Sequence, residues 1–406
     1  MRIRVFNEVT QYVFFLVLGI TFSCSVCLAG EGYKEEISSY VEFIKQQNTE
    51  PVDYIFGLFE KYDIVVICER LHPEMTQWEL IWDVVSDQRF IDDVGNIFTE
   101  YGPQNNQRLV DGLMRKKDLS DDELDAEATK ILRNASIWPV WQNKNFHDYL
   151  KKLYRLNQSL GEGKDINHYF SDVRLNWRTM TSKKYEEFKK TTLRQRDKLM
   201  ADRIRIKFKR IQAGSESRKK CLVIMNFRHG FQPMKNKMTG KDEVNTAALL
   251  FQMFPGKVAN VMLNSVCLDE GRDGLVTEVI QAGKWDAAFK ALGNPEVGFD
   301  MAGSPFAEEH FDMYPAQFVE DDCTYANIFT GFVFYKPLED HVCIEGVPGL
   351  FDGRFREEYL KRAKCISDKY YNEAIEILEK YDQESSRVVD HYTPGYAEKI
   401  DMWLQK

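Results

Sequence analysis

The chain has 406 residues, of which 44% are hydrophobic and 29% are charged. This length suits one large α/β domain or two smaller ones, and the ordinary composition excludes a disordered protein. The formal net charge of -9 argues against nucleic acid as a partner. The basic residues within 183–220 are interleaved with acidic ones, which is typical of a solvated helix face.

The N-terminal residues have the pattern of a secretory signal. Arginines among the first four residues precede an apolar run over residues 12–22, and small residues follow up to Ala29 and Gly30. The sequence therefore predicts a signal peptide over residues 1–29, cleaved after Ala29 or Gly30. The mature protein would be exported, to the periplasm or the cell surface.

Two other fates of this segment would bring the protein to a membrane. The apolar stretch approaches the roughly 18–20 residues that span a bilayer, so an uncleaved anchor is one alternative. Lipid attachment at Cys24 or Cys27 is the other, although neither preceding triplet is a good lipoprotein box. Membrane contact is expected only in these two cases.

The cysteines that follow the signal give no disulfide framework. They form no CxxC pair and have no metal-ligand spacing. Those in apolar, strand-like runs are expected to be buried free thiols. The six are Cys68, Cys221, Cys267, Cys323, Cys343 and Cys365.

Apolar patterns predict helices and strands in alternation. Short continuous apolar runs indicate buried parallel strands, and apolar residues at a spacing of three or four indicate helices. The expected strands are residues 64–68, 94–98, 166–170, 221–225 and 258–263. The expected helices are residues 34–47, one that starts near Pro73, 145–158 and a long one over 183–211. This alternation predicts an α/β fold with a mostly parallel sheet and helices on both faces.

The last hundred residues differ from the rest. Residues 328–335 are an aromatic-rich run that we expect to form an edge strand. Residues 355–381 predict a pair of polar amphipathic helices or one long helix. We therefore expect an α/β domain over residues 34–350, followed by a helical C-terminal extension over residues 351–406.

Ionisable residues follow three of the predicted strands. Glu69 and His72 come after the first strand, Glu100 after the second, and His229 after the fourth. In an open parallel sheet, ligands bind at the carboxyl ends of the strands. These four residues are therefore candidates for one site.

Their chemistry suits the activation of water. A carboxylate beside an imidazole raises its basicity and fixes its tautomer, which prepares a base that takes a proton from water. The second carboxylate and the second imidazole could orient the water, protonate a leaving group or complete a metal shell. Two histidines and two carboxylates also suit zinc, manganese or iron.

Each of these residues also has a purely structural interpretation. Taken singly, a carboxylate here would most often be a loop residue, and His229 a hydrogen-bonded structural histidine. The remaining histidines lack comparable placement, and we expect them to be structural or exposed. The sequence has no GxSxG elbow, no GxGxxG motif and no phosphate-binding loop, so serine nucleophiles and nucleotide binding have little support.

The order of these motifs resembles the erythromycin esterase-like group, within a superfamily that includes ChaN-type haem-binding lipoproteins and the Tiki/TraB proteins. The resemblance covers roughly residues 60–265. The similar segments are Val65-Val66-Ile67-Cys68-Glu69-Arg70-Leu71-His72, Ile97-Phe98-Thr99-Glu100, Trp138-Pro139-Val140-Trp141, the strand that ends near Asp172, Arg196-Asp197-Lys198-Leu199-Met200 and Asn226-Phe227-Arg228-His229. Each motif is loose, and their order carries the likeness.

The resemblance implies that His72 activates water, with Glu69, Glu100 and His229 completing the site. It also implies that Arg196 and Asp197 line the substrate-binding site. We expect Asp172 and Arg70 to contact the substrate as well. This sequence departs from the family pattern in two places. Cys68 replaces a glycine before the first glutamate, and Thr76-Gln77 stands where the esterases have a further glutamate. The second departure puts a macrolide substrate in doubt.

Three functions remain open at this point. The first is a hydrolase that acts on an ester, lactone or amide of a small molecule, with or without a metal ion. The second is a haem- or iron-binding surface protein, which a Soret band on haem titration would identify. The third is a binding protein without catalysis, which the replacement at Cys68 motivates.

Overall fold

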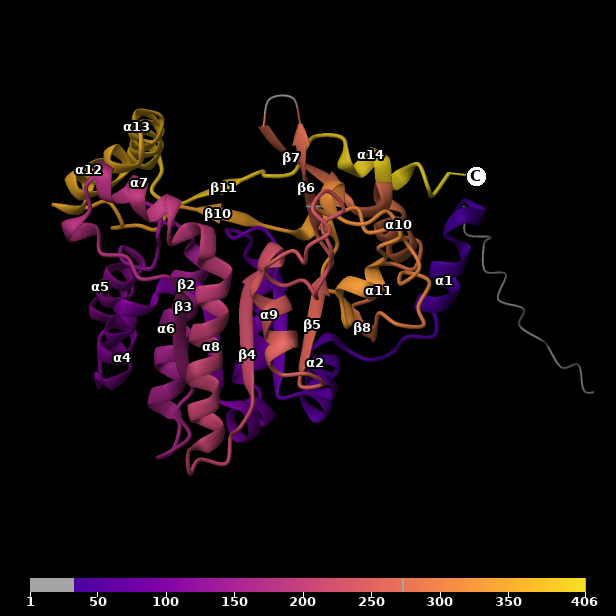
Figure 1. Cartoon of the computed structure of the whole chain (residues 1–406), viewed down its shortest axis with the longest axis horizontal. Coiled ribbons are helices and arrows are strands. Elements are labelled where there is room, and N and C mark those ends of the chain that lie inside the picture. The colour runs from indigo at the N-terminus through magenta and orange to yellow at the C-terminus, as the bar shows by residue number, and fades with distance from the viewer. Residues whose placement is uncertain (1–32, 272–273, 315, 406) are drawn as a thin grey trace, which may run out of the picture. The chain divides into compact units, whose positions relative to one another are not determined.

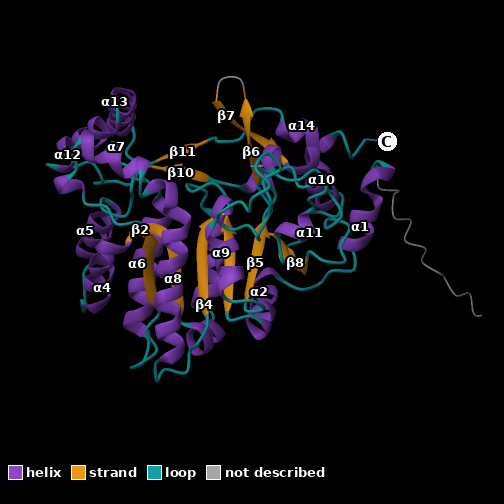
Figure 2. Ribbon diagram, in the orientation of Figure 1, coloured by secondary structure: helices purple, strands orange, loops and turns teal. Residues whose placement is uncertain are grey.

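The computed structural model describes residues 33–271, 274–314 and 316–405. The predicted signal peptide and its two cysteines lie outside the described residues. The described residues form an α/β fold around a seven-stranded sheet, in the order β3-β2-β4-β1-β5-β9-β8 (Figure 1, Figure 2). Only β8, paired with β9, is antiparallel to its neighbour within this sheet, and this confirms the predicted fold class.

The strands of this sheet are β1 (Ile64–Glu69), β2 (Asn96–Pro103), β3 (Asn167–Asp172), β4 (Cys221–Asn226), β5 (Val258–Leu263), β8 (Val297–Asp300) and β9 (Gly331–Phe334). Two separate ribbons are formed by β6 (Val266–Gly271) with β7 (Gly274–Val279) and by β10 (Cys343–Glu345) with β11 (Arg387–Val389). The helices are α1 (Ser38–Ile44), α2 (Pro51–Lys61), α3 (Thr76–Ser86), α4 (Gln107–Arg115), α5 (Asp121–Leu132), α6 (Lys144–Ser159), α7 (Ser182–Lys190), α8 (Arg196–Ala213), α9 (Thr246–Met253), α10 (Lys284–Lys290), α11 (Tyr325–Ile328), α12 (Phe355–Ile366), α13 (Asp368–Gln383) and α14 (Tyr396–Asp401).

The central strand β1 shows why the sheet needs helices on both faces. All six of its residues are buried, and successive side chains of a strand point to opposite faces. Val65 and Ile67 pack with helices α2, α3, α5 and α6 on one face. Ile64 and Val66 pack with α8 and α9 on the other face. The helical layers are visible on both sides of the strands in Figure 2.

Two expectations about elements were wrong. Residues 183–211 are not one helix, because the chain breaks between α7 and α8 at Thr191 and Thr192. The hydroxyl of Thr191 donates to the carbonyl oxygen of Glu187 (2.7 Å), and such local bonds of β-branched residues compete with helix continuation. Strand β9 is not an edge strand either, since it lies between β5 and β8.

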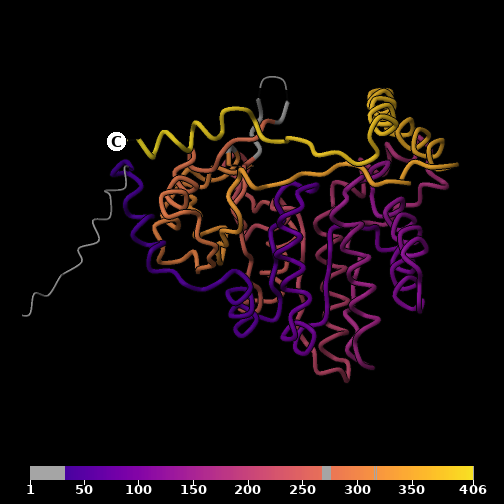
Figure 3. The backbone as a smooth tube through the Cα atoms, turned by 180° about the vertical axis from the view of Figure 1, so that it is seen from behind, coloured from indigo at the N-terminus to yellow at the C-terminus, as the bar shows by residue number. Residues whose placement is uncertain are grey.

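The C-terminal part returns to the body of the molecule. Residues Tyr33–Lys406 form one compact unit. Helices α12 and α13 contribute Tyr359 and Tyr381 to the same apolar cluster as β1. From α13 the chain runs back beside β10 to the C-terminal helix α14 (Figure 3). Within the described residues, none of the helices is long and apolar enough to cross a membrane.

Candidate active site

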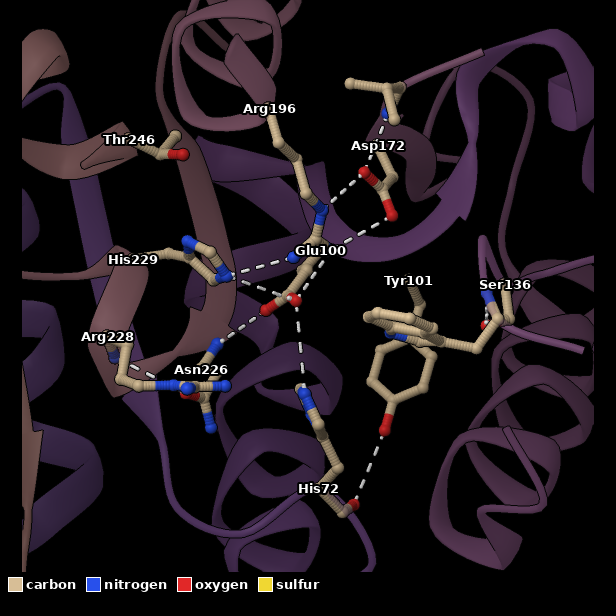
Figure 4. Close-up of polar contacts among 12 residues, drawn as sticks. His72, Glu100, Tyr101, Ser136, Asp172, Arg196, Asn226, Arg228, His229 and Thr246 are labelled. Atoms are coloured by element: carbon tan, nitrogen blue, oxygen red, sulfur yellow. Dashed lines mark hydrogen bonds and ion pairs between the residues drawn. The ribbon is translucent and has the colours of Figure 1, made fainter. Parts of the chain in front are cut away.

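The carboxyl ends of four parallel strands bring the candidate residues together. Glu69 ends β1 in register with Asn226, which ends β4. Glu100 lies in β2, and Asp172 ends β3 opposite Pro103. Figure 4 shows His72, His229 and Arg196 directed toward the Glu100 carboxylate. The sheet therefore gathers residues that are far apart in the sequence at one edge.

The first acid–base pair is Glu69 and His72. Nδ1 of His72 lies 2.8 Å from Oε2 of Glu69, and the indole Nε1 of Trp78 donates to Oε1 of the same carboxylate (3.0 Å). Burial alone would lower the pKa of His72, but the Glu69 carboxylate outweighs burial and raises it. Burial raises the pKa of Glu69 as well. The hydrogen bond therefore occupies Nδ1 and leaves Nε2 of His72 for other partners.

The second pair is Asp197 and His229. Nδ1 of His229 lies 2.7 Å from Oδ1 of Asp197, which also accepts bonds from the backbone N–H and the hydroxyl of Thr246 (2.8 Å each). Burial alone would lower the pKa of His229, but Asp197 and Glu100 outweigh it and raise the pKa to about 9. His229 is therefore an imidazolium near neutral pH.

Glu100 lies between the two pairs. Its Oε1 is 3.4 Å from Nε2 of His229 and 3.9 Å from Nε2 of His72, while its Oε2 accepts the backbone N–H of Asn226 (3.0 Å). Burial alone would raise the pKa of Glu100, but His229 and Arg196 outweigh burial and hold that pKa well below its usual range. Glu100 is thus a buried carboxylate that faces both imidazoles.

Arg196 neutralises much of this negative charge. Its guanidinium donates two bonds to Asp172 (2.8 and 3.0 Å) and one to Glu100 (2.8 Å). Its Nη1 lies 3.1 Å from Nε2 of His229, to which it donates when that nitrogen carries no proton. Burial would lower the pKa of Arg196, but Asp172 and Glu100 outweigh burial and raise it. Two buried carboxylates, Asp172 and Glu100, therefore share this one guanidinium.

Several residues that support His72 and His229 were not singled out from the sequence. The His72 ring packs against Trp141 and Tyr101, with ring centroids 4.8 and 5.6 Å away. Its backbone carbonyl oxygen accepts a bond from the amide of Asn145 (2.7 Å). The tryptophan-rich segment was the one available signal. Asn145 and Thr246 gave none, because helices α6 and α9 bring them in from distant parts of the chain.

Arg70 does not lie in the site, contrary to expectation. Its side chain points away from the cluster and is fully buried. Its guanidinium donates to Asn264 and Tyr335 and to the side chains of Glu74 and Thr76. These contacts use its donors inside the protein, so Arg70 braces the chain after β1 and is not available to a substrate.

The two departures from the family pattern have structural roles. Cys68 points away from the acid–base cluster, and its sulfur lies 3.6 Å from the carbonyl oxygen of Gly230. A Cβ at position 230 would lie only 2.4 Å from that sulfur, so the cysteine occupies space that this glycine leaves open. Gln77 is buried and bridges the backbone of Arg70 and Leu71 (2.6 and 2.8 Å). It braces the turn that carries His72.

The cluster does not suit a metal ion. Among the residues that the structure describes, no group of three or more His, Cys, Asp or Glu side chains is arranged to hold one. The Arg196 guanidinium lies within 3.1 Å of both the Glu100 oxygen and the His229 nitrogen that would serve as ligands. Its positive charge occupies the place that zinc, manganese or iron would need. The six cysteines of the described chain are free thiols.

Comparison with known proteins gave matches among solved structures only. No protein-family model matches the chain, and no curated protein matches it. A mutant of the erythromycin esterase EreC in its open conformation is similar, with 11% identity over 75% of this chain and 96% of that chain, and a TM-score of 0.45. A Bacillus cereus protein (9% identity, 73% and 97% covered, TM-score 0.43) and a succinoglycan biosynthesis protein (9%, 74% and 96%, 0.46) are also similar.

Proposed function

We propose that this protein is a hydrolase that cleaves an ester, lactone or amide with His72 as the general base. One observation carries the proposal. Nδ1 of His72 is held by Glu69 at 2.8 Å, while its side chain remains 22% exposed. An imidazole that is fixed at one nitrogen and reachable at the other can take a proton from water.

The reaction that follows uses both imidazoles. Nε2 of neutral His72 removes a proton from water, and the water oxygen forms a bond to the carbonyl carbon of the substrate. Glu69 stabilises the imidazolium that results. The bond to the leaving group then breaks, and the leaving oxygen or nitrogen takes the proton from Nε2 of His229. Arg196 donates to that nitrogen once it is unprotonated, since the two atoms are 3.1 Å apart.

Glu100 links the two halves of this cycle. After one turnover His72 holds an extra proton and His229 lacks one. Glu100 Oε1 lies within 4 Å of Nε2 of both rings, so one proton transferred through this carboxylate or through solvent restores the starting state.

The first prediction concerns the base. Positioned general bases contribute about 10²–10⁴-fold in rate, so His72→Ala should lower kcat by at least 10²-fold on any substrate that the wild-type protein hydrolyses. The measurement is turnover of a panel of aryl esters, lactones and amides, followed by thermal unfolding of the variant.

His310→Ala is the matched control, because His310 is exposed and lies outside the cluster. This control should keep wild-type turnover. An alanine variant at His72 that folds and keeps wild-type kcat on a true substrate would remove the basis of the proposal.

A further inference from the structure

A polar pocket opens just beyond the ends of strands β2 and β3. It has a volume of about 200 Å³, less than the roughly 300–1,000 Å³ of pockets that enclose a drug-sized ligand. Its wall is formed by residues that follow β2 and β3 and by the end of α5. This size suits one substituent of a substrate better than a whole one.

The charge of this pocket is unusual for an acidic protein. Arg108, Lys130 and Arg178 line it, and no aspartate or glutamate does. Lys130 donates to Glu127 (3.3 Å), but the guanidinium groups of Arg108 and Arg178 have no hydrogen bond or ion pair with the part of the chain that the structure describes. Arg108 and Arg178 are exposed. Two unpaired guanidinium groups at the rim of a polar pocket provide the donors that carboxylate, phosphate or sulfate oxygens bind best.

The floor of the pocket is fixed by side-chain amides. Asn105 donates to and accepts from the backbone of Leu175 (2.9 and 3.0 Å), which ties the chain after β2 to the chain after β3. Asn106 donates to the carbonyl oxygen of Asn134 (2.8 Å). Trp177 forms part of the wall, with its indole N–H bound to the carbonyl oxygen of Ser136 (3.1 Å). The two arginines therefore extend from a braced surface.

This pocket and the acid–base cluster share the same strand ends. Asp172, which binds Arg196, is three residues before Leu175 of the pocket, a span of at most about 11 Å. Glu100 is likewise five residues before Asn105. The segment that ends with Trp141, against which the His72 ring packs, begins in this pocket at Asn134. These short stretches of chain place the wall of the pocket near the acid–base cluster.

We infer that this pocket binds an anionic group of the substrate, so that the substrate class is small esters or amides that carry a carboxylate, phosphate or sulfate. The inference rests on the proposed hydrolysis for the bond that is cleaved. The pocket itself is defined by Arg108 and Arg178. These side chains hold the charged end of the molecule while the reactive carbonyl lies beside His72.

The experiment measures anion binding apart from catalysis. Inorganic phosphate and sulfate are titrated calorimetrically into wild-type protein, the double variant Arg108→Gln/Arg178→Gln, and the control Arg354→Gln. Arg354 is exposed and likewise has no side-chain partner among the described residues. Because the double variant loses the charged donors that would bind the anion, it should weaken binding by at least about tenfold, and the control should not.

Catalysis gives the second measurement. For esters with an anionic group, the double variant should raise KM by at least about tenfold with kcat within about twofold of wild type, while neutral esters are unaffected. Equal phosphate affinity in wild-type protein and the double variant, or an equal loss of affinity in the control, would overturn the assignment of this pocket as an anion site. If phosphate binding depends on these arginines but His72→Ala changes no hydrolysis, the pocket stands and the proposed reaction fails.

Discussion

His72 and His229 are each held at Nδ1 by a carboxylate, but they have opposite tasks in the proposed reaction. The base must be neutral, and the acid must carry a proton. Glu69 raises the pKa of His72 above its usual 6.5, and Asp197 with Glu100 raises the pKa of His229 to about 9 despite burial. The active form, with neutral His72 and protonated His229, therefore exists between the pKa of His72 and the pKa of His229.

The second prediction is a bell-shaped dependence of kcat on pH. The rate should rise on the alkaline side of pH 6.5 as His72 loses its proton, and fall near pH 9 as His229 loses its own. Asp197→Asn removes the carboxylate that raises the pKa of His229 most, so it should move the falling limb to lower pH. A falling limb that stays in place in this variant would show that another group is the acid.

Part of this site could be predicted from residue types alone. Glu69, His72, Glu100 and His229 each follow an apolar run that is easy to recognise, and neighbouring parallel strands end at one edge of a sheet. Arg70 follows the same strand, yet its side chain turns to the opposite direction. The position of a residue in the sequence shows that it lies near the end of a strand. The direction of its side chain depends on its partners, and one partner of Arg70 is Asn264, almost 200 residues further along the chain.

At the level of elements, the break between α7 and α8 places Arg196 in the site, at the start of α8. The periodic apolar residues continue through the break, so the pattern over 183–211 predicts one helix. The threonines at 191 and 192 end α7, and Arg196 then begins α8 at the carboxyl edge of the sheet. Strand β8 was missed for a related reason, since its four residues give no periodic signal of their own.

Strand β1 meets the loop that follows β4 where Cys68 contacts Gly230, and this contact gives the third prediction. Gly230→Ala should destabilise the protein by about 1–3 kcal/mol, because the new Cβ would lie 2.4 Å from the sulfur of Cys68. Cys68→Ala removes that sulfur, so the double variant should recover much of the loss. Urea unfolding of both single variants and the double variant measures the coupling.

A simple sum of the two single effects would contradict this contact. Activity gives a second readout, because residue 230 directly follows His229. The Gly230→Ala variant should lose turnover along with stability, and the double variant should regain both.

On the scale of the whole molecule, the C-terminal helices are joined to the segment that packs on His72. Arg362 of α12 is buried, and its Nη1 donates to the carbonyl oxygens of Arg133 and Pro139 (2.6 and 3.1 Å). Strand β10 forms bridges at Asn143 and at Glu74. Residues on either side of the predicted boundary after residue 350 therefore contact one another.

The fourth prediction tests this connection. Arg362→Met leaves one buried and one partly buried carbonyl oxygen without their donor. This should cost about 2–5 kcal/mol of stability and lower turnover through movement of Trp141. Arg356→Met is the control, because Arg356 is 40% exposed and pairs with Asp382 at the surface. Thermal unfolding and kcat are measured for both. Equal, small effects in the two variants would mean that the C-terminal part does not support the site.

The strand order also determines when the protein can fold during its synthesis. The central strand β1 pairs with β4 and β5, which follow it by more than 150 residues. While the ribosome is still making residues 70–220, β1 has neither neighbour and cannot be buried between them. Pairings of this range close slowly, because the intervening chain must be ordered first. The acid–base cluster is therefore a late product of folding, assembled only after β4 has joined the sheet.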